Sequence, residues 1–217
     1  MRIHRSVSSN AHVCDGAEGI LCGLGAKHAS TSSILGREVP GSGLIGTRMN
    51  IVAQPLVSIV VPAYNEAKHI RECIESLLAQ TYQNWECIIA NNCSTDDSGD
   101  IGRQYAAKDF RVRVYDNEEF LRAVPNFNQA LRRISPSSKY CKIVFADDWI
   151  FPECLEKMVE VAEEYPSIGI VGGYGLQGRQ VMWAGLPYPS RLIPGREICR
   201  KLFLEDLYVF GTGTSLL

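Results

Sequence analysis

The chain has 217 residues, of which 46% are hydrophobic and 21% charged, and its formal net charge at pH 7 is −2. This composition suits one globular domain with its own core. The nearly balanced charge gives no indication of binding to nucleic acid or to an anionic membrane. Eight scattered cysteines indicate a reduced protein, and the lack of a secretory signal or a long apolar run predicts a cytoplasmic location without a transmembrane segment.

The first 54 residues lack the hydrophobic periodicity of the rest. They are rich in Gly, Ser, Ala and His, whereas apolar patterning becomes strong from Leu56 onward. We therefore expect a flexible, poorly patterned extension over residues 1–54, or an upstream start ahead of Met49, and a domain over residues 55–217. A Gly-x-Gly-x-x-Gly pattern at 41–46 has no strand before it, so we interpret it as a linker and not as a phosphate-binding loop.

Strands and amphipathic helices alternate along the rest of the chain. Short, largely apolar runs predict buried strands at 56–61, 85–90, 112–114, 140–146 and 168–172. Apolar residues at helical spacing predict helices around 70–78, 101–105, 127–134 and 152–166. Asn65 is placed to cap the first of these helices. The alternation predicts an α/β fold with a mostly parallel sheet covered on both faces.

Polar side chains follow three of the predicted strands at the point where each strand ends. The clusters are 62–66, 91–96 and the pair Asp147 and Asp148. The carboxyl ends of parallel strands share one edge of a sheet, where ligands bind in open α/β folds. Two adjacent carboxylates repel each other, so a divalent cation or a ligand is a reason for them to persist. For each cluster taken alone, a helix cap or a solvated turn is the alternative.

Four ordered motifs together resemble the family 2 glycosyltransferases. They span roughly residues 56–173 and comprise Val57–Glu66, Ser76–Tyr82, Asn92–Asp96 and Ala146–Asp148. The resemblance implies the GT-A fold, a Rossmann-like, mostly parallel sheet flanked by helices. It also implies an inverting sugar transfer from a nucleotide-diphosphate donor to an acceptor hydroxyl, with Mg²⁺ or Mn²⁺ as cofactor. We further expect a glycan or lipid-linked acceptor and a role in cell-surface polysaccharide or glycan synthesis. We also expect peripheral association with the inner face of the membrane.

The same resemblance implies roles for individual residues. Asp148 is the expected metal ligand, and Asp147 is expected to contact the ribose or the donor sugar. Tyr64 would offer a stacking face to the nucleoside, and Glu66 would accept a hydrogen bond from the ribose. The other donor-binding residues that the resemblance implies are Pro62, Ala63, Asn91, Asn92, Ser94 and Asn126.

Two features depart from the family pattern. Asn91 and Asn92 stand where most members carry Asp-Asp or Asp-Asn, and because an amide both donates and accepts hydrogen bonds, the nucleobase preference does not carry over. No general base is found in the matched region, and the later acids at 197, 205 and 206 are interpreted as a solvated helix face. Because residues 211–217 resemble the start of a further strand, we expect a C-terminally truncated form whose base lies beyond Leu217.

Two other functions remain open. A nucleotide-sugar-binding fragment without turnover would keep Asp148 and the nucleoside pocket but lack the base. A nucleotidyltransferase would need a Gly-rich, basic loop after the first strand, and residues 62–66 are not such a loop.

Overall fold

The computed structural model describes residues 7–8, 11–14, 19–21, 54–177, 180–182, 192–204 and 215–217. Its main sheet has eight strands in the order β3-β2-β9-β12-β7-β4-β5-β6. These strands are β2 (Ala11–Cys14), β3 (Gly19–Leu21), β4 (Leu56–Ala63), β5 (Trp85–Asn91), β6 (Val112–Asp116), β7 (Ser138–Ile143), β9 (Ile170–Gly173) and β12 (Ser215–Leu216). Two further pairs are β1 (Val7–Ser8) with β8 (Trp149–Ile150), and β10 (Gly175–Gln177) with β11 (Gln180–Met182).

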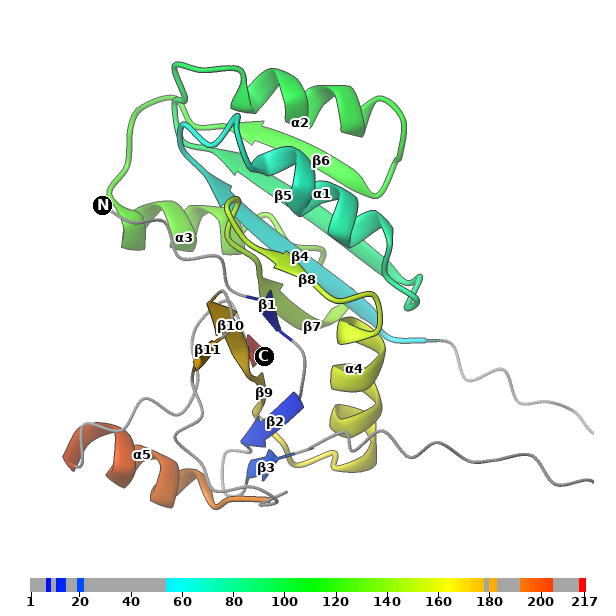
Figure 1. Ribbon diagram of the computed structural model, residues 1–217, viewed down its shortest axis with the longest axis vertical. Helices are drawn as coiled ribbons and strands as arrows, with labels where there is room; N and C mark the ends of the chain where they lie inside the picture. The colour runs from blue at the N-terminus through cyan, green and yellow to red at the C-terminus, as the bar shows by residue number, and fades with distance from the viewer. Residues whose placement is uncertain are drawn as a thin grey trace, which may run out of the picture.

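Helices cover both faces of this sheet (Figure 1). The described helices are α1 (Ile70–Leu78), α2 (Ser98–Ala106), α3 (Ala123–Leu131), α4 (Cys154–Glu164) and α5 (Gly195–Leu204). Buried residues of α1, α2 and α4 share one core with Ile59 and Val61 of β4, whereas α3 packs in a second core with Val60. Successive residues of a strand point to opposite faces, so the two cores lie on opposite sides of the sheet. The predicted α/β architecture is confirmed.

The central part of the sheet is parallel. Strand β4 pairs in parallel with β5 and β7, and β5 pairs in parallel with β6. The strand predicted at 140–146 ends earlier, at Ile143. The backbone N–H of Val144 still donates to the carbonyl oxygen of Val60 at 3.0 Å. The chain then leaves the strand ladder, so that Asp147 and Asp148 lie in a turn past the end of the strand.

The expectation that Asn65 caps α1 is wrong. Helix α1 begins at Ile70 with His69 at its N-cap, and no side chain makes a capping hydrogen bond there. Asn65 instead adopts a left-handed backbone conformation, with a φ of 56°. Its side-chain oxygen accepts a hydrogen bond from the backbone N–H of Thr95 at 2.7 Å. Asn adopts this conformation more readily than most residues. Through the hydrogen bond to Thr95, Asn65 joins the loop after β4 to the loop after β5.

Segments from both ends of the chain lie beside the central strands. Strand β2 pairs antiparallel with β9, β1 pairs parallel with β8, and β12 pairs antiparallel with both β7 and β9. A strand predicted within 211–217 is therefore found, at Ser215–Leu216. The domain boundary at residue 54 stays a prediction, and the Gly-rich pattern at 41–46 lies outside the described residues together with Met49. Among the described helices, none is long and apolar enough to cross a membrane.

Candidate functional site

The carboxyl ends of the parallel strands meet at one edge of the sheet. Ala63 at the end of β4 pairs with Asn91 of β5, and Asn91 in turn pairs with Asp116 of β6. On the other side of β4, Val60 pairs with Ile143 at the end of β7. The loops that follow these strands therefore begin side by side, as the polar clusters in the sequence predict.

These loops and the start of α3 line a pocket of about 290 Å³. Seven residues that the sequence analysis assigned to donor binding lie in its lining: Pro62, Ala63, Tyr64, Glu66, Asn92, Asn126 and Asp147. The other lining residues are Phe120, Leu121, Ala123, Phe127, Phe145 and Ala146. The pocket thus combines apolar and aromatic surface with two carboxylates and two amides.

Three of the assigned residues lie outside this lining. The Asn91 amide nitrogen donates to Oδ1 of Asp116 at 2.6 Å, and the Asn91 side-chain oxygen accepts from the backbone N–H of Ser94 at 3.3 Å. Asn91 therefore joins the ends of β5 and β6. The Ser94 hydroxyl accepts from the backbone N–H of Asn65 at 3.0 Å. Asp148 is only 7% exposed. The roles of these three residues in binding stay predictions.

The two adjacent aspartates lie in different environments. Asp147 is partly exposed and lines the pocket, whereas the buried Asp148 donates its backbone N–H to the carbonyl oxygen of Phe145 at 2.9 Å. Burial lowers the pKa of the fully buried Lys142 ammonium, and the nearby Cys154 and Asp148 partly offset this effect. Asp148 thus lies close enough to Lys142 to favour its charged form, although burial is the larger effect. Sequence reasoning missed Lys142, because a lysine inside a short strand pattern predicts a solvent-facing side chain.

The start of α2 holds the β4–α1 loop in place. The hydroxyl of Ser98 accepts from the backbone N–H of Glu66 at 2.7 Å, and Oδ2 of Asp96 accepts from the backbone N–H of Ala67 at 3.0 Å. Desolvation raises the pKa of the Asp96 carboxyl, but hydrogen bonds from Ser98 and Ala67 outweigh it and leave this pKa below its usual value. Oε2 of Glu66 also lies 3.2 Å from Nδ1 of His69, so both the backbone and the side chain of Glu66 have fixed partners.

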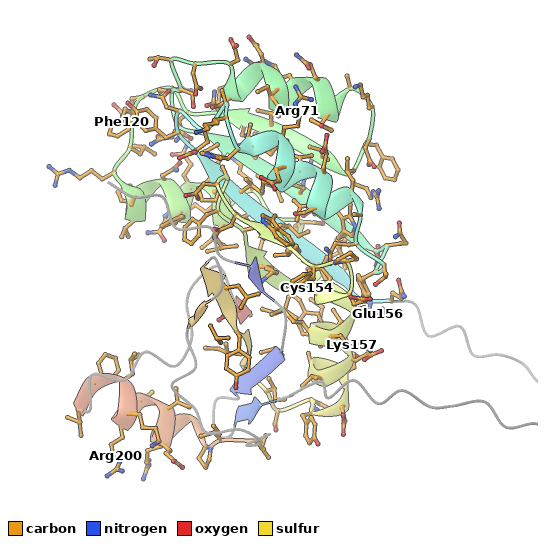
Figure 2. The ribbon with its side chains drawn as sticks, viewed as in Figure 1. Arg71, Phe120, Cys154, Glu156, Lys157 and Arg200 are labelled. Carbon is orange, nitrogen blue, oxygen red and sulfur yellow. The ribbon has the colours of Figure 1, made fainter. Side chains whose placement is uncertain are left out.

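Two exposed aromatic rings lie together in the pocket lining. Tyr64 is 46% and Phe120 57% exposed, and their ring centroids are 4.9 Å apart with the ring planes tilted by 59°. Figure 2 shows Phe120 on the loop that leads into α3. The pair offers apolar surface to a flat ligand ring. Sequence reasoning missed Phe120, because a single aromatic residue in a loop carries no periodic signal.

A network of amides lies behind the pocket. Nδ2 of Asn117 donates to Oδ1 of Asn92 at 2.8 Å and to Oδ1 of Asn126 at 2.9 Å. Nε2 of Gln129 donates to Oδ1 of Asn117 at 3.1 Å. Sequence reasoning also did not identify Asn117 as a residue of the site. The signal was present, because Asn117 directly follows strand β6 just as the three recognised clusters follow their strands.

The lining residues fit a divalent cation that shares oxygen ligands with a substrate. The described residues contain no group of three or more His, Cys, Asp or Glu side chains that could hold a metal ion. Asp147 and Glu66 nevertheless bring carboxylate oxygen to the pocket. Mg²⁺ is commonly held by one or two carboxylates together with substrate phosphates, so this donor set is sufficient in kind.

Comparisons with known proteins match most of this chain to one family. A model of the family "Glycosyl transferase family 2" matches residues 58–214. EpsE of Bacillus subtilis (strain 168) is 31% identical over 166 residues, which cover 73% of this chain and 59% of EpsE. TuaG of the same strain is 35% identical over 126 residues, which cover 58% of this chain and 49% of TuaG. Both are named putative glycosyltransferases, TuaG for teichuronic acid biosynthesis.

The chain spans only 59% and 49% of the lengths of these two relatives. Among solved structures, S. aureus TarS 1-349 is similar with a TM-score of 0.50 and 22% sequence identity, over 70% of this chain and 49% of TarS 1-349. At that level of identity the likeness shows a shared fold. The family match itself covers well over half of the chain. The chain therefore belongs to glycosyl transferase family 2 and has the GT-A fold.

Proposed function

We propose that this chain is a glycosyltransferase that moves a sugar from a nucleoside-diphosphate donor to an acceptor hydroxyl with inversion. The observation that carries the proposal is the gathering of seven of the expected donor-binding residues in one pocket at the carboxyl edge of the sheet. Family membership supports the reaction class, and the name of TuaG supports a role in cell-surface polysaccharide synthesis. The acceptor in this proposal is a glycan or lipid-linked chain, reached at the cytoplasmic face of the membrane.

The nucleoside is held by stacking and by one carboxylate. Tyr64 and Phe120 supply the aromatic surface on which the base stacks. Glu66 accepts hydrogen bonds from the ribose hydroxyls. Ser98 holds the backbone of Glu66 and Nδ1 of His69 lies 3.2 Å from its carboxylate, so both are positioned before a ligand arrives.

A diphosphate needs a cation in this pocket. The lining contains the carboxylates of Glu66 and Asp147 and, within the described part of the chain, no Lys or Arg. An anionic ligand would therefore be repelled. When bound, Mg²⁺ or Mn²⁺ neutralises the diphosphate and stabilises it as the leaving group. We assign the ion to Asp147, although the sequence analysis favoured Asp148, because Asp147 lines the pocket whereas Asp148 is buried outside the lining.

Calorimetric titration with UDP, GDP, CDP and ADP, with and without Mn²⁺, tests the donor site. We expect binding that depends on Mn²⁺ and weakens by about tenfold or more in Asp147→Asn, since the variant loses a charged ligand to the ion. Asp148→Asn should lower the melting temperature but keep the metal dependence. Asp100→Asn is the matched control, because Asp100 lies exposed on α2 outside the pocket. Equal affinity and equal metal dependence of wild type and Asp147→Asn would remove Asp147 from the proposed ion site.

A donor-binding protein without turnover is the second candidate. Inverting transfer needs a base for the acceptor hydroxyl. The carboxylates in the pocket lining, as far as the structure describes the chain, are Glu66 and Asp147, and both are assigned to the donor. Release of nucleoside diphosphate from UDP- and GDP-sugars, measured with and without glycan acceptors, separates the two candidates. Tight donor binding with no release above a protein-free control would favour the binder.

A further inference from the structure

We propose that Asn117, which does not line the pocket, is a positioning residue that turns the amide of Asn126 so that its NH₂ group faces the ligand. This part of the pocket then selects a ligand group that offers a hydrogen-bond-accepting oxygen and rejects one that offers N–H. The inference rests on the proposed donor-binding function. A nucleobase carbonyl and a phosphate oxygen share the required chemistry.

The orientation of the network is set by backbone atoms. The backbone N–H of Leu121 donates to Oδ1 of Asn92 at 2.9 Å, and the backbone carbonyl oxygen of Leu121 accepts from Nδ2 of Asn92 at 2.8 Å. A backbone N–H only donates and a carbonyl oxygen only accepts. The side-chain amide of Asn92 therefore has a single orientation, with its oxygen toward Leu121 N–H.

The next amide follows from the first. Because Oδ1 of Asn92 faces Asn117 at 2.8 Å, Asn117 must present its nitrogen there. The same nitrogen lies 2.9 Å from Asn126, which must then present its oxygen. Gln129 supports this orientation by donating to the oxygen of Asn117 at 3.1 Å. Both hydrogens of the Asn117 amide are thus committed, one to each neighbour.

The ligand meets the other end of the Asn126 amide. Asn126 lines the pocket and is 6% exposed, and its Nδ2 has no hydrogen-bond partner among the described residues. Asn92 also lines the pocket, but its oxygen already accepts two hydrogen bonds, from Leu121 and Asn117. An amide oxygen has two lone pairs, so that of Asn92 has none left for a ligand. Asn92 consequently offers only N–H to a ligand, and Asn126, whose oxygen is turned toward Asn117, presents its NH₂ group.

The NH₂ group of Asn126 is thus free to donate to a ligand oxygen in the pocket. The Asn92 amide cannot turn without breaking both bonds to Leu121, whereas Asn126 is held through Asn117. Asn117→Asp replaces the amide donor by a group of the same shape that only accepts. Asn126 should then turn to donate to the new carboxylate and present its oxygen to the pocket.

NMR of the side-chain amides in ¹⁵N-labelled protein tests this positioning directly. The NH₂ signal of Asn126 is assigned by its loss in Asn126→Asp. Without ligand, we expect this signal to move downfield in Asn117→Asp, because the group becomes bonded to a carboxylate. In wild type, the tightest binder among UDP, GDP, CDP and ADP with Mg²⁺ should shift the Asn126 signal but not that of Asn117. Uridine or another matching nucleoside, compared with pyrophosphate and Mg²⁺, identifies whether the base or the phosphate causes the shift.

Affinity provides the second measurement. Asn117→Asp should weaken binding of the same nucleoside diphosphate by about tenfold or more, because the oxygen of the turned Asn126 amide would then face an oxygen of the ligand. Asn128→Asp adds the same charge on the exposed side of α3 and should stay within about twofold of wild type.

The outcomes separate this inference from the proposed function. An Asn126 signal that does not move in ligand-free Asn117→Asp overturns the positioning role, whether or not a nucleotide binds. A nucleotide that binds wild type without shifting the Asn126 signal overturns the ligand contact but leaves the donor site standing. If no nucleotide binds wild type, the proposed function fails and the ligand contact fails with it.

Discussion

Asn91→Asp tests whether position 91 serves the sheet or the donor. The family pattern places a carboxylate at this position, and the resemblance implies that Asn91 contacts the donor. In the structure its amide nitrogen donates to Asp116 at 2.6 Å, and Asp116 also pairs with Arg103 at 3.0 Å. A carboxylate at 91 would face a second carboxylate across the ends of β5 and β6. We therefore expect a loss of stability.

The contacts set the size of this loss. A hydrogen bond to a charged group contributes about 1.5–3 kcal/mol. Two carboxylates about 4 Å apart near a protein surface repel by about 4 kcal/mol at an effective dielectric constant of about 20. Arg103 and the solvent around the half-exposed Asp116 screen much of that repulsion. The N–H of Ser94 keeps an acceptor at 91, because a carboxylate also accepts. We expect Asn91→Asp to lower the free energy of unfolding by about 2–4 kcal/mol.

Urea denaturation of a double-mutant cycle measures the effect. Asp116→Asn in the Asn91→Asp background exchanges donor and acceptor, so the hydrogen bond forms again with the same net charge. This double variant should recover to within about 1 kcal/mol of wild type, with a coupling energy of about 2 kcal/mol. The reasoning would be refuted by an Asn91→Asp protein as stable as wild type, or by a double variant no more stable than the single one.

Three further perturbations probe the loop, the buried lysine and the aromatic pair. Ser98→Ala leaves the backbone N–H of Glu66 without an acceptor and should lower the free energy of unfolding, measured in urea, by about 1–3 kcal/mol. The control Ser137→Ala, at an exposed position, should change it by less than about 0.5 kcal/mol. Equal effects of the two substitutions would contradict the role of Ser98 in holding the β4–α1 loop. Burial lowers the folded-state pKa of Lys142 below its usual 10.5, so the unfolded chain binds this proton more tightly and wild-type stability should rise relative to Lys142→Met as pH approaches 10.5. If the free energies of unfolding of the two proteins changed equally with pH between that lowered pKa and 10.5, the lowered pKa of Lys142 would be contradicted. Tyr64→Ala and Phe120→Ala should each weaken nucleoside-diphosphate binding by about 1–3 kcal/mol in calorimetry, while Phe110→Ala, 91% exposed and outside the pocket lining, should not; three equal affinities would exclude stacking.

Much of the fold could be predicted from local patterns. The apolar runs around Val60 and Ile89 and the helical stripe at Ile74 depend on periodicities of two and 3.6 residues, which are properties of the chain itself. The gathering of polar clusters at one edge followed from parallel pairing. Asn65 was misassigned because Asn suits both a helix cap and a left-handed loop, and only the position of Thr95 distinguishes them.

The sequence by itself determined the alternation of strands and helices between residues 56 and 172, the sheet edge where the polar clusters gather, and most of the side chains that line the pocket. Tertiary structure decided which member of each adjacent pair faces that pocket. Asp147 lines the pocket and Asp148 is buried. Strand β7 ends at Ile143, and the turn closed by the hydrogen bond from Asp148 N–H to the carbonyl oxygen of Phe145 then sets the directions of the two side chains. Along a strand, side chains alternate between faces, but past its end their directions depend on contacts with other loops. The position of Asn117 behind Asn126 likewise required neighbours that are distant in the chain.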